Sequence, residues 1–86
     1  MNINQLVEIV KNKLHNNIVC DNIEIQDKTF LHKSHASHEK NKFHIKLIIT
    51  SDYLKKKNKI ESTKEIYKIL EKELKYNIHS IQILIN

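Results

Sequence analysis

The chain is 86 residues long with a formal net charge of +5; all fifteen basic residues are lysine, and glycine, proline and tryptophan are absent. This length allows one domain with a single two-layer core and excludes a second domain. No apolar run could cross a bilayer and no secretory signal is visible, so we expect a soluble monomer in the cytoplasm, with a mitochondrion or another organelle as the alternative. The lysine excess favours an acidic or nucleic-acid partner, although such a composition more often means solvated surface.

The first segment, residues 3–14, has the pattern of an amphipathic helix. Its apolar residues recur at helical spacing, and Asn2 and Gln5 are placed to form an N-terminal capping box. We expect the helix to end at residues 15–17, where an asparagine can take the left-handed conformation. The single cysteine, Cys20, excludes an internal disulfide and fits a reducing compartment. With no histidine or acid in a nucleophile pattern around it, we interpret it as a packed or half-exposed bystander.

Two predicted strands follow. Residues 23–29 alternate at period two but have only two isoleucines on the apolar face, which indicates an edge strand. Residues 43–51 alternate between a wholly apolar and a mixed face, as is typical of a strand inside a small sheet. We expect the two strands to pair antiparallel, joined by a loop from about residue 30 to 42. A loop this long in so small a domain is more often functional or mobile than merely connecting.

The C-terminal third predicts a helix and a strand. Residues 53–60 are strongly basic, and the Ser-Thr-Lys-Glu sequence of residues 62–65 has the pattern of a capping box that opens a helix over 62–76. The last run, residues 78–85, is predicted to be a strand in which His79 shares the apolar face with three isoleucines.

The predicted element order is helix, strand, strand, helix, strand. A right-handed crossover from 43–51 through the second helix to 78–85 makes these two strands parallel and places both helices on one face of the sheet. The sequence therefore predicts an α+β fold, a two-layer sandwich with a three-stranded mixed sheet in which 43–51 is the central strand.

Several short motifs occur along this frame. They are Asp27-Lys28-Thr29-Phe30-Leu31-His32-Lys33-Ser34-His35, His44, Ser51-Asp52, Ile66-Tyr67, Leu70, Glu73-Leu74 and Ile78-His79-Ser80-Ile81. Their order and spacing resemble those of the BolA-like proteins from about Ile23 to the C-terminus. The resemblance implies a fold similar to the class II KH domain. It also implies two roles of different classes: partnership with a monothiol glutaredoxin around a shared [2Fe-2S] cluster, and nucleic-acid binding as a transcription regulator.

For the cluster role, the resemblance implies that His79 is one metal ligand and that the loop supplies another, His32 or His35. The remaining ligands would come from the glutaredoxin and its glutathione, and the isolated chain would bind no cofactor. Neutral imidazole is a reasonable iron ligand. Without the resemblance, a lone strand histidine such as His79 is more often structural than a ligand. His44 lies off the main apolar face of its strand, and we assign it a structural role. The His-x-x-His-x-x-His series that ends at His38 matches no zinc-finger spacing, so a structural zinc site is not expected.

For the nucleic-acid role, the predicted contacts are Lys55, Lys56, Lys57 and Lys59. A KH domain clamps the nucleic-acid backbone with a Gly-x-x-Gly loop, which a chain without glycine lacks. We therefore expect any DNA binding to be weak and mostly electrostatic. The sequence contains no paired-acid, nucleophile–base or phosphate-loop pattern, so it favours an adaptor over an enzyme.

Overall fold

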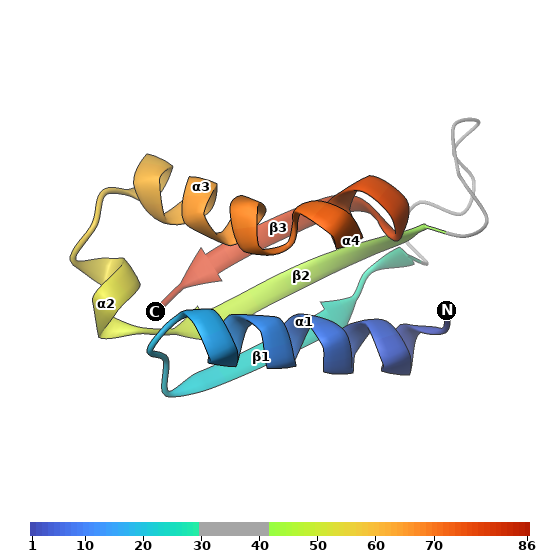
Figure 1. Ribbon diagram of the computed structural model, residues 1–86, viewed down its shortest axis with the longest axis horizontal. Helices are drawn as coiled ribbons and strands as arrows, with labels where there is room; N and C mark the ends of the chain where they lie inside the picture. The colour runs from blue at the N-terminus through green and yellow to red at the C-terminus, as the bar shows by residue number, and fades with distance from the viewer. Residues whose placement is uncertain (30–41) are drawn as a thin grey trace.

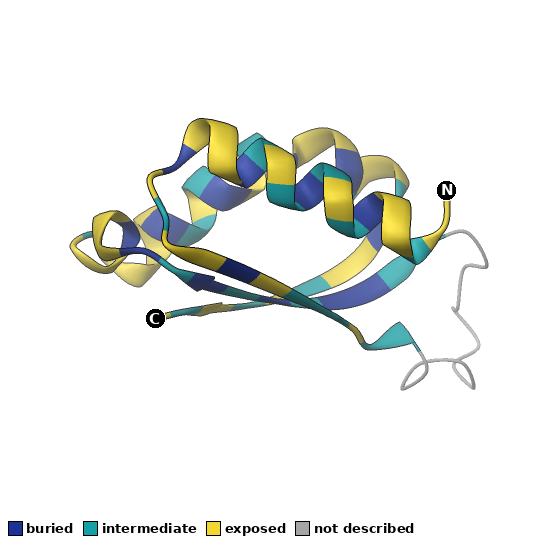
Figure 2. Cartoon of the chain, turned by 90° about the horizontal axis from the view of Figure 1, so that it is seen from below, coloured by how far each residue is buried: buried dark blue, intermediate teal, exposed yellow. Residues whose placement is uncertain are grey.

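The computed structural model describes residues 1–29 and 42–86. Its elements are, in order, α1 (Ile3–Asn17), β1 (Asn22–Asp27), β2 (Phe43–Thr50), α2 (Asp52–Lys55), α3 (Lys59–Ile69), α4 (Glu71–Tyr76) and β3 (Ile78–Ile85). The three strands lie side by side in Figure 1, and Figure 2 shows the helices gathered on one face of the sheet. The predicted two-layer α+β sandwich is confirmed. None of the helices in the described ranges is long and apolar enough to cross a membrane.

The sheet has the strand order β1-β2-β3, as predicted. β1 pairs antiparallel with β2, from Asn22 opposite Thr50 to Asp27 opposite Ile45. β3 pairs parallel with β2, and its regular part ends with Ile85 opposite Ile49. The central position of β2 explains its composition, since a strand with neighbours on both sides contributes apolar side chains along its whole length.

The core lies between the sheet and the helices. α1 contributes Leu6, Val10 and Leu14, all fully buried at the spacing predicted from the sequence. Alternate residues of β2 face them, because successive side chains of a strand point to opposite faces. The buried apolar side chains are Leu6, Val10, Leu14, Ile18, Ile23, Ile45, Leu47, Ile49, Leu54, Ile66, Leu70 and Ile78.

The two ends of α1 compare differently with prediction. At its start the capping box is confirmed: Asn2 Oδ1 accepts the Gln5 N–H at 2.8 Å, and Gln5 Oε1 accepts the Asn2 N–H at 2.9 Å. At its end the expected left-handed asparagine is wrong, because no described residue has a positive φ. The chain instead leaves the helix through Ile18, which is extended and donates its N–H to the Leu14 carbonyl. Ile18 is buried, so core packing favours this exit over a left-handed cap.

The start of the second long helix was also wrongly predicted. α3 begins at Lys59, where the side chain of Asn58 accepts the Glu61 N–H at 2.9 Å. Ser62 lies inside the helix instead of capping it, and its buried hydroxyl donates to the Leu54 carbonyl at 2.7 Å. That carbonyl belongs to α2, a short helix that the sequence did not predict and that Ser51 caps by accepting the Leu54 N–H.

A partly buried ion pair connects α1 with α4. Lys13 Nζ lies 2.7 Å from Glu73 Oε2, and the Glu73 side chain is only 6% exposed. The second oxygen, Oε1, is buried and has no hydrogen-bond partner within the described ranges. The Glu73 carboxylate therefore depends on Lys13 for its charge compensation.

Candidate functional site

The chain before residue 30 is fixed to the first residues of β2. Asp27 accepts two hydrogen bonds on Oδ1, from the Thr29 N–H at 3.0 Å and from the Thr29 hydroxyl at 2.5 Å. This is the local turn that an aspartate makes with the backbone two residues ahead, and it ends β1 at Asp27 instead of at the predicted Thr29. The Thr29 hydroxyl oxygen also accepts the His44 N–H at 3.2 Å, and the Lys28 N–H donates to the His44 carbonyl at 2.7 Å.

His44 connects β2 with β3 through its side chain. The residue is only 5% exposed, and its Nδ1 lies 2.6 Å from the Ser80 hydroxyl, with donor and acceptor set by the ring tautomer. Ser80 is also its pairing partner in the parallel ladder. Burial with a hydrogen-bonded ring nitrogen agrees with the structural role that we assigned to His44.

His79 lies at an irregularity of that ladder. Phe43 pairs with Ile78, but His44 pairs with Ser80, so the register of the ladder shifts by one residue at His79. Such a register shift re-aims side chains locally. The His79 ring is 4.8 Å from the His44 ring, centroid to centroid, with 41° between the planes, and the residue is exposed.

The predicted phase of His79 is therefore corrected. We expected it to share the face of the β3 isoleucines, which pack against the core below the helices. Its ring instead contacts His44, which alternates with Ile45 and Leu47 and so lies on the opposite face of the sheet. The sequence could not reveal this contact, because the register shift is visible only in the pairing of two strands that are distant in sequence.

The imidazoles at this end of the sheet form an incomplete ligand set. His32 and His35 lie outside the described residues, as does His38. Within residues 1–29 and 42–86, no group of three or more histidine, cysteine or acidic side chains is arranged to hold a metal. Of the histidines expected to bind a metal, the described residues therefore contain one, His79, and it is exposed.

The predicted lysines separate into two groups. Lys57 Nζ lies 2.6 Å from Glu65 Oε1 and 2.8 Å from the Tyr53 hydroxyl, and it is 4.5 Å from the centre of the Tyr53 ring. The hydrogen bond to Glu65 raises the pKa of Lys57 above its usual range, and the same bond lowers the pKa of Glu65. The charge of Lys57 is thus compensated within the chain.

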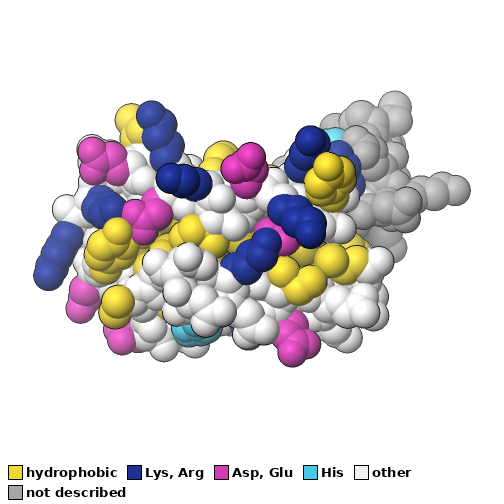
Figure 3. Space-filling view, viewed as in Figure 1, with side chains coloured by type: hydrophobic (Ala, Val, Ile, Leu, Met, Phe, Trp, Pro, Cys, Tyr) yellow, Lys and Arg dark blue, Asp and Glu magenta, His cyan; other side chains and the backbone are white. Residues whose placement is uncertain are grey.

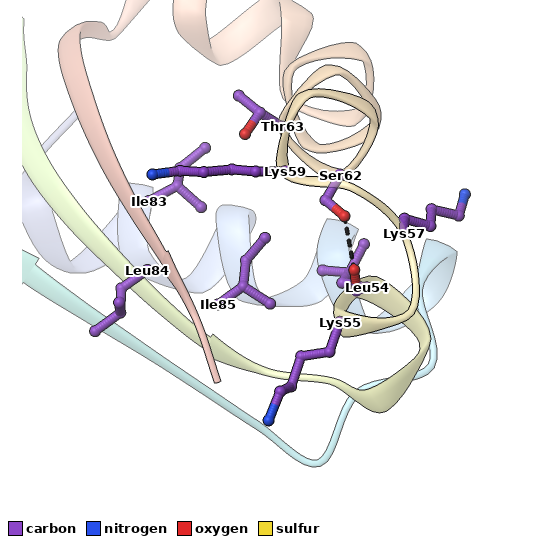
Figure 4. Close-up of a pocket in the computed structure, with 9 residues that line it drawn as sticks. All are labelled: Leu54, Lys55, Lys57, Lys59, Ser62, Thr63, Ile83, Leu84 and Ile85. Carbon is purple, nitrogen blue, oxygen red and sulfur yellow. Dashed lines mark hydrogen bonds between the residues drawn. The ribbon is translucent and has the colours of Figure 1, made fainter.

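Lys55 and Lys59 line a cavity of about 280 Å³ between α2, α3 and the end of β3. Figure 4 shows Lys59 extending toward Ile83 while the Lys57 side chain points away. Lys56 is exposed at the end of α2. On the face seen in Figure 3, lysine and acidic side chains are interspersed, so the described residues of this face form no continuous basic patch.

Cys20 has a histidine neighbour that the sequence pattern did not indicate. Its Sγ lies 3.4 Å from His15 Nδ1. Burial, and then the charge of Asp21, raise the pKa of the Cys20 thiol. A raised pKa disfavours the thiolate that a nucleophile needs, which agrees with a half-buried bystander.

Three solved structures of BolA proteins or domains are similar to this chain in fold. The BolA domain of SufE1 from Arabidopsis thaliana has a TM-score of 0.77 and 24% identity, with 100% of this chain and 93% of that chain covered. BolA1 from Arabidopsis thaliana has a TM-score of 0.75 and 21% identity, covering 92% of this chain and 87% of that chain. BolA1 from Mus musculus has a TM-score of 0.71 and 16% identity, covering 90% and 60% respectively.

The sequence gives the same assignment independently of the fold. Residues 14–86 match the family model described as BolA-like protein. The chain therefore belongs to the BolA-like family, as the order of its motifs predicted. No curated protein matches the chain.

Proposed function

We propose that this chain is an adaptor that pairs with a monothiol glutaredoxin around a shared [2Fe-2S] cluster, in cluster trafficking or in iron and redox regulation. The observation that carries the proposal is the exposed His79 ring at the irregularity of β3, in contact with the buried His44. An exposed imidazole whose inner neighbour is fixed can meet a metal held by a second protein without a large rearrangement.

The residues of this chain would have different roles in binding the cluster. His79 would contribute one nitrogen ligand, and His32, or else His35, would contribute a second ligand. His44 would hold the His79 ring from the protein side, itself oriented by Ser80. Glutaredoxin and glutathione would supply the ligands that this chain lacks. When bound, the cluster supplies electron transfer and transferable iron and sulfide.

Reconstitution with a monothiol glutaredoxin, iron, sulfide and glutathione tests this function. The visible absorption and circular dichroism of the complex should change in His79→Ala and in His32→Ala, and less in His35→Ala. His15→Ala is the matched control. This exposed histidine lies near the C-terminal end of α1, and its described contact is with Cys20. If His79→Ala leaves both the spectrum and the stability of the heterodimer unchanged, His79 is structural and the cluster role is wrong.

The pH dependence of the complex provides a second readout. An imidazole binds a metal only in its neutral form. The heterodimer should therefore weaken as the pH falls below about 6.5, the ordinary pKa of histidine. In a complex lacking both His79 and the loop ligand, this dependence should be reduced.

Nucleic-acid binding is the second candidate, favoured by the exposed Lys56 beside Lys55 and Lys59. With Lys57 compensated by Glu65, three lysines remain for phosphate contacts. Such contacts give a slope of about −3 in log K against log salt and little sequence preference. Titration of duplex DNA at two salt concentrations tests it. Tight binding to one sequence that survives moderate salt would overturn the electrostatic description.

A further inference from the structure

The two edges of the sheet are unequally protected. β1 is six residues long and carries Glu24 and Asp27. β3 is eight residues long, has no charged side chain, and has no neighbouring strand on its outer side within the described chain. Natural proteins usually protect an exposed edge with charges, because its unpaired backbone groups are a template for another strand.

The backbone of β3 shows which groups this edge offers. Asn86 donates its N–H to the Ile49 carbonyl at 2.8 Å and accepts the Ser51 N–H at 3.0 Å. In a parallel ladder the residues that point both groups at the neighbouring strand alternate with residues that point both groups away. Since Asn86 points at β2, Ile83 and Ile85 direct their N–H and C=O groups outward.

An aliphatic cavity lies beside these same two residues. Its floor is formed by Ile83, Ile85 and Leu54, and Thr63 and Lys59 of α3 form its opposite wall (Figure 4). The volume of about 280 Å³ is below the usual range for drug-sized ligands, about 300–1,000 Å³. It suits an aliphatic side chain inserted from a neighbouring chain.

The rim of the cavity is cationic. Neither Lys55 nor Lys59 has an ion pair with another residue of the described ranges, in contrast to Lys57. Their side chains extend in different directions from the cavity in Figure 4. An acidic side chain on either side of the inserted aliphatic one would complement these charges.

We propose that the outer edge of β3 binds an extended acidic segment of a partner protein as an added strand. The backbone of this segment pairs with Ile83 and Ile85, and one of its aliphatic side chains enters the cavity. Acidic side chains two residues before and two residues after it meet Lys55 and Lys59, because residues at period two share a face. Ile83 is four residues beyond His79, or about 13 Å along a strand, so this surface is separate from the cluster ligand.

A short synthetic peptide tests this interaction with the whole chain, without iron or glutaredoxin. The probe is acetyl-Thr-Glu-Thr-Ile-Thr-Glu-Thr-amide, whose isoleucine and glutamates share one face. We expect amide exchange at Ile83 and Ile85 to slow and their backbone NMR signals to shift on binding. The control peptide acetyl-Thr-Thr-Glu-Ile-Glu-Thr-Thr-amide has the same composition with its glutamates on the other face, and should bind about tenfold more weakly.

A charge-matched pair of protein variants completes the test. Lys55→Glu with Lys59→Glu should weaken peptide binding about tenfold, while Lys68→Glu with Lys72→Glu, which changes the net charge equally on exposed helix positions, should not. Equal binding of both peptides, or unchanged exchange at Ile83 and Ile85, would overturn the proposal. So would displacement of the peptide by single-stranded oligothymidylate that itself protects these amides, since the occupant would then be a nucleic acid.

Discussion

The two ends of β3 differ in the regularity of the backbone and in chemistry. At the start, the ladder shifts by one residue and His79 and Ser80 both meet the buried His44. At the end, the ladder is regular and isoleucines line a cavity with lysines at its rim. The irregular part of the ladder exposes a polar side chain, whereas the regular part of this edge strand exposes its backbone. The two ends of one strand thus offer different chemical groups to a partner.

The largest expected effect on the free energy of unfolding is at Leu47, in the strand that pairs with both ends of β3. Leu47 is fully buried in the middle of β2 and pairs with Ile83. Leu47→Ala should lower the free energy of unfolding by about 2–5 kcal/mol, because the removed methyl groups leave a cavity in the core. Urea denaturation measures it, with Ile48→Ala, on the half-buried opposite face, as the milder control. Similar losses in both variants would mean that the core does not lie where we describe it.

A smaller effect on stability is expected at the ion pair between α1 and α4, the helix that precedes the start of β3. Lys13→Met removes the partner of Glu73, whose carboxylate is buried, while Lys13 itself is 37% exposed. We expect a loss of about 1–2 kcal/mol in the free energy of unfolding, less than for a fully buried pair because water reaches the lysine. Lys68→Met, at an exposed position of α3, is the control. A loss no larger than in that control would show that Glu73 needs no compensation.

Ser80→Ala sharpens the comparison at the polar end alone. It leaves the buried His44 Nδ1 without the hydroxyl that lies 2.6 Å away, which should cost about 1–2 kcal/mol of stability. The NMR signals of the His79 ring should shift too, while amide exchange at Ile83 and Ile85 stays unchanged. Gln82→Ala, an exposed change on the same strand, is the control. An unperturbed His79 ring would contradict its support by His44.

The smallest effect is expected at the lysine-flanked end and depends on pH. The pKa of Glu65 is lowered by Lys57 from an ordinary value of 4.5, so this pair stabilises the folded state above that pH, and the contribution is lost as the pH falls through the lowered pKa. Glu65→Gln should therefore reduce the loss of urea stability between neutral and acid pH, and Glu61→Gln, which changes an exposed carboxylate, should not. Parallel acid profiles for wild type and Glu65→Gln would contradict the ion pair.

Local patterns predicted the elements well where one signal acted alone. Period-two alternation gave the three strands, and Asn2 with Gln5 gave the start of α1. The start of α3 was wrongly predicted because Asn58 and Ser62 are both residue types that cap helices. The hydrogen bond from Ser62 to the Leu54 carbonyl leaves Asn58 as the cap. That contact is tertiary, so no local pattern contains it.

The candidate site was only partly predictable for the same physical reason. The position of His79 near the start of the last strand followed from the sequence, but its contact with His44 depends on a register shift between two strands. Likewise, Lys57 differs from Lys55 and Lys59 because its charge is compensated by Glu65, which lies eight residues after Lys57 in the chain. Sequence spacing therefore predicted which residues are candidates. Their arrangement in space depends on contacts between segments that are distant in sequence.

The most direct test of the cluster role is to detect the nitrogen of His79 on the iron. Only this chain would be prepared with isotope-labelled histidine, assembled with unlabelled glutaredoxin and glutathione around the cluster, reduced, and measured by pulsed electron paramagnetic resonance. The predicted result is two strong hyperfine couplings from labelled nitrogen, one from His79 and one from the loop histidine; one of them is lost in His79→Ala, and both persist in His15→Ala. Couplings that are absent from the wild-type complex, or that are both unchanged in His79→Ala, would contradict His79 as the ligand.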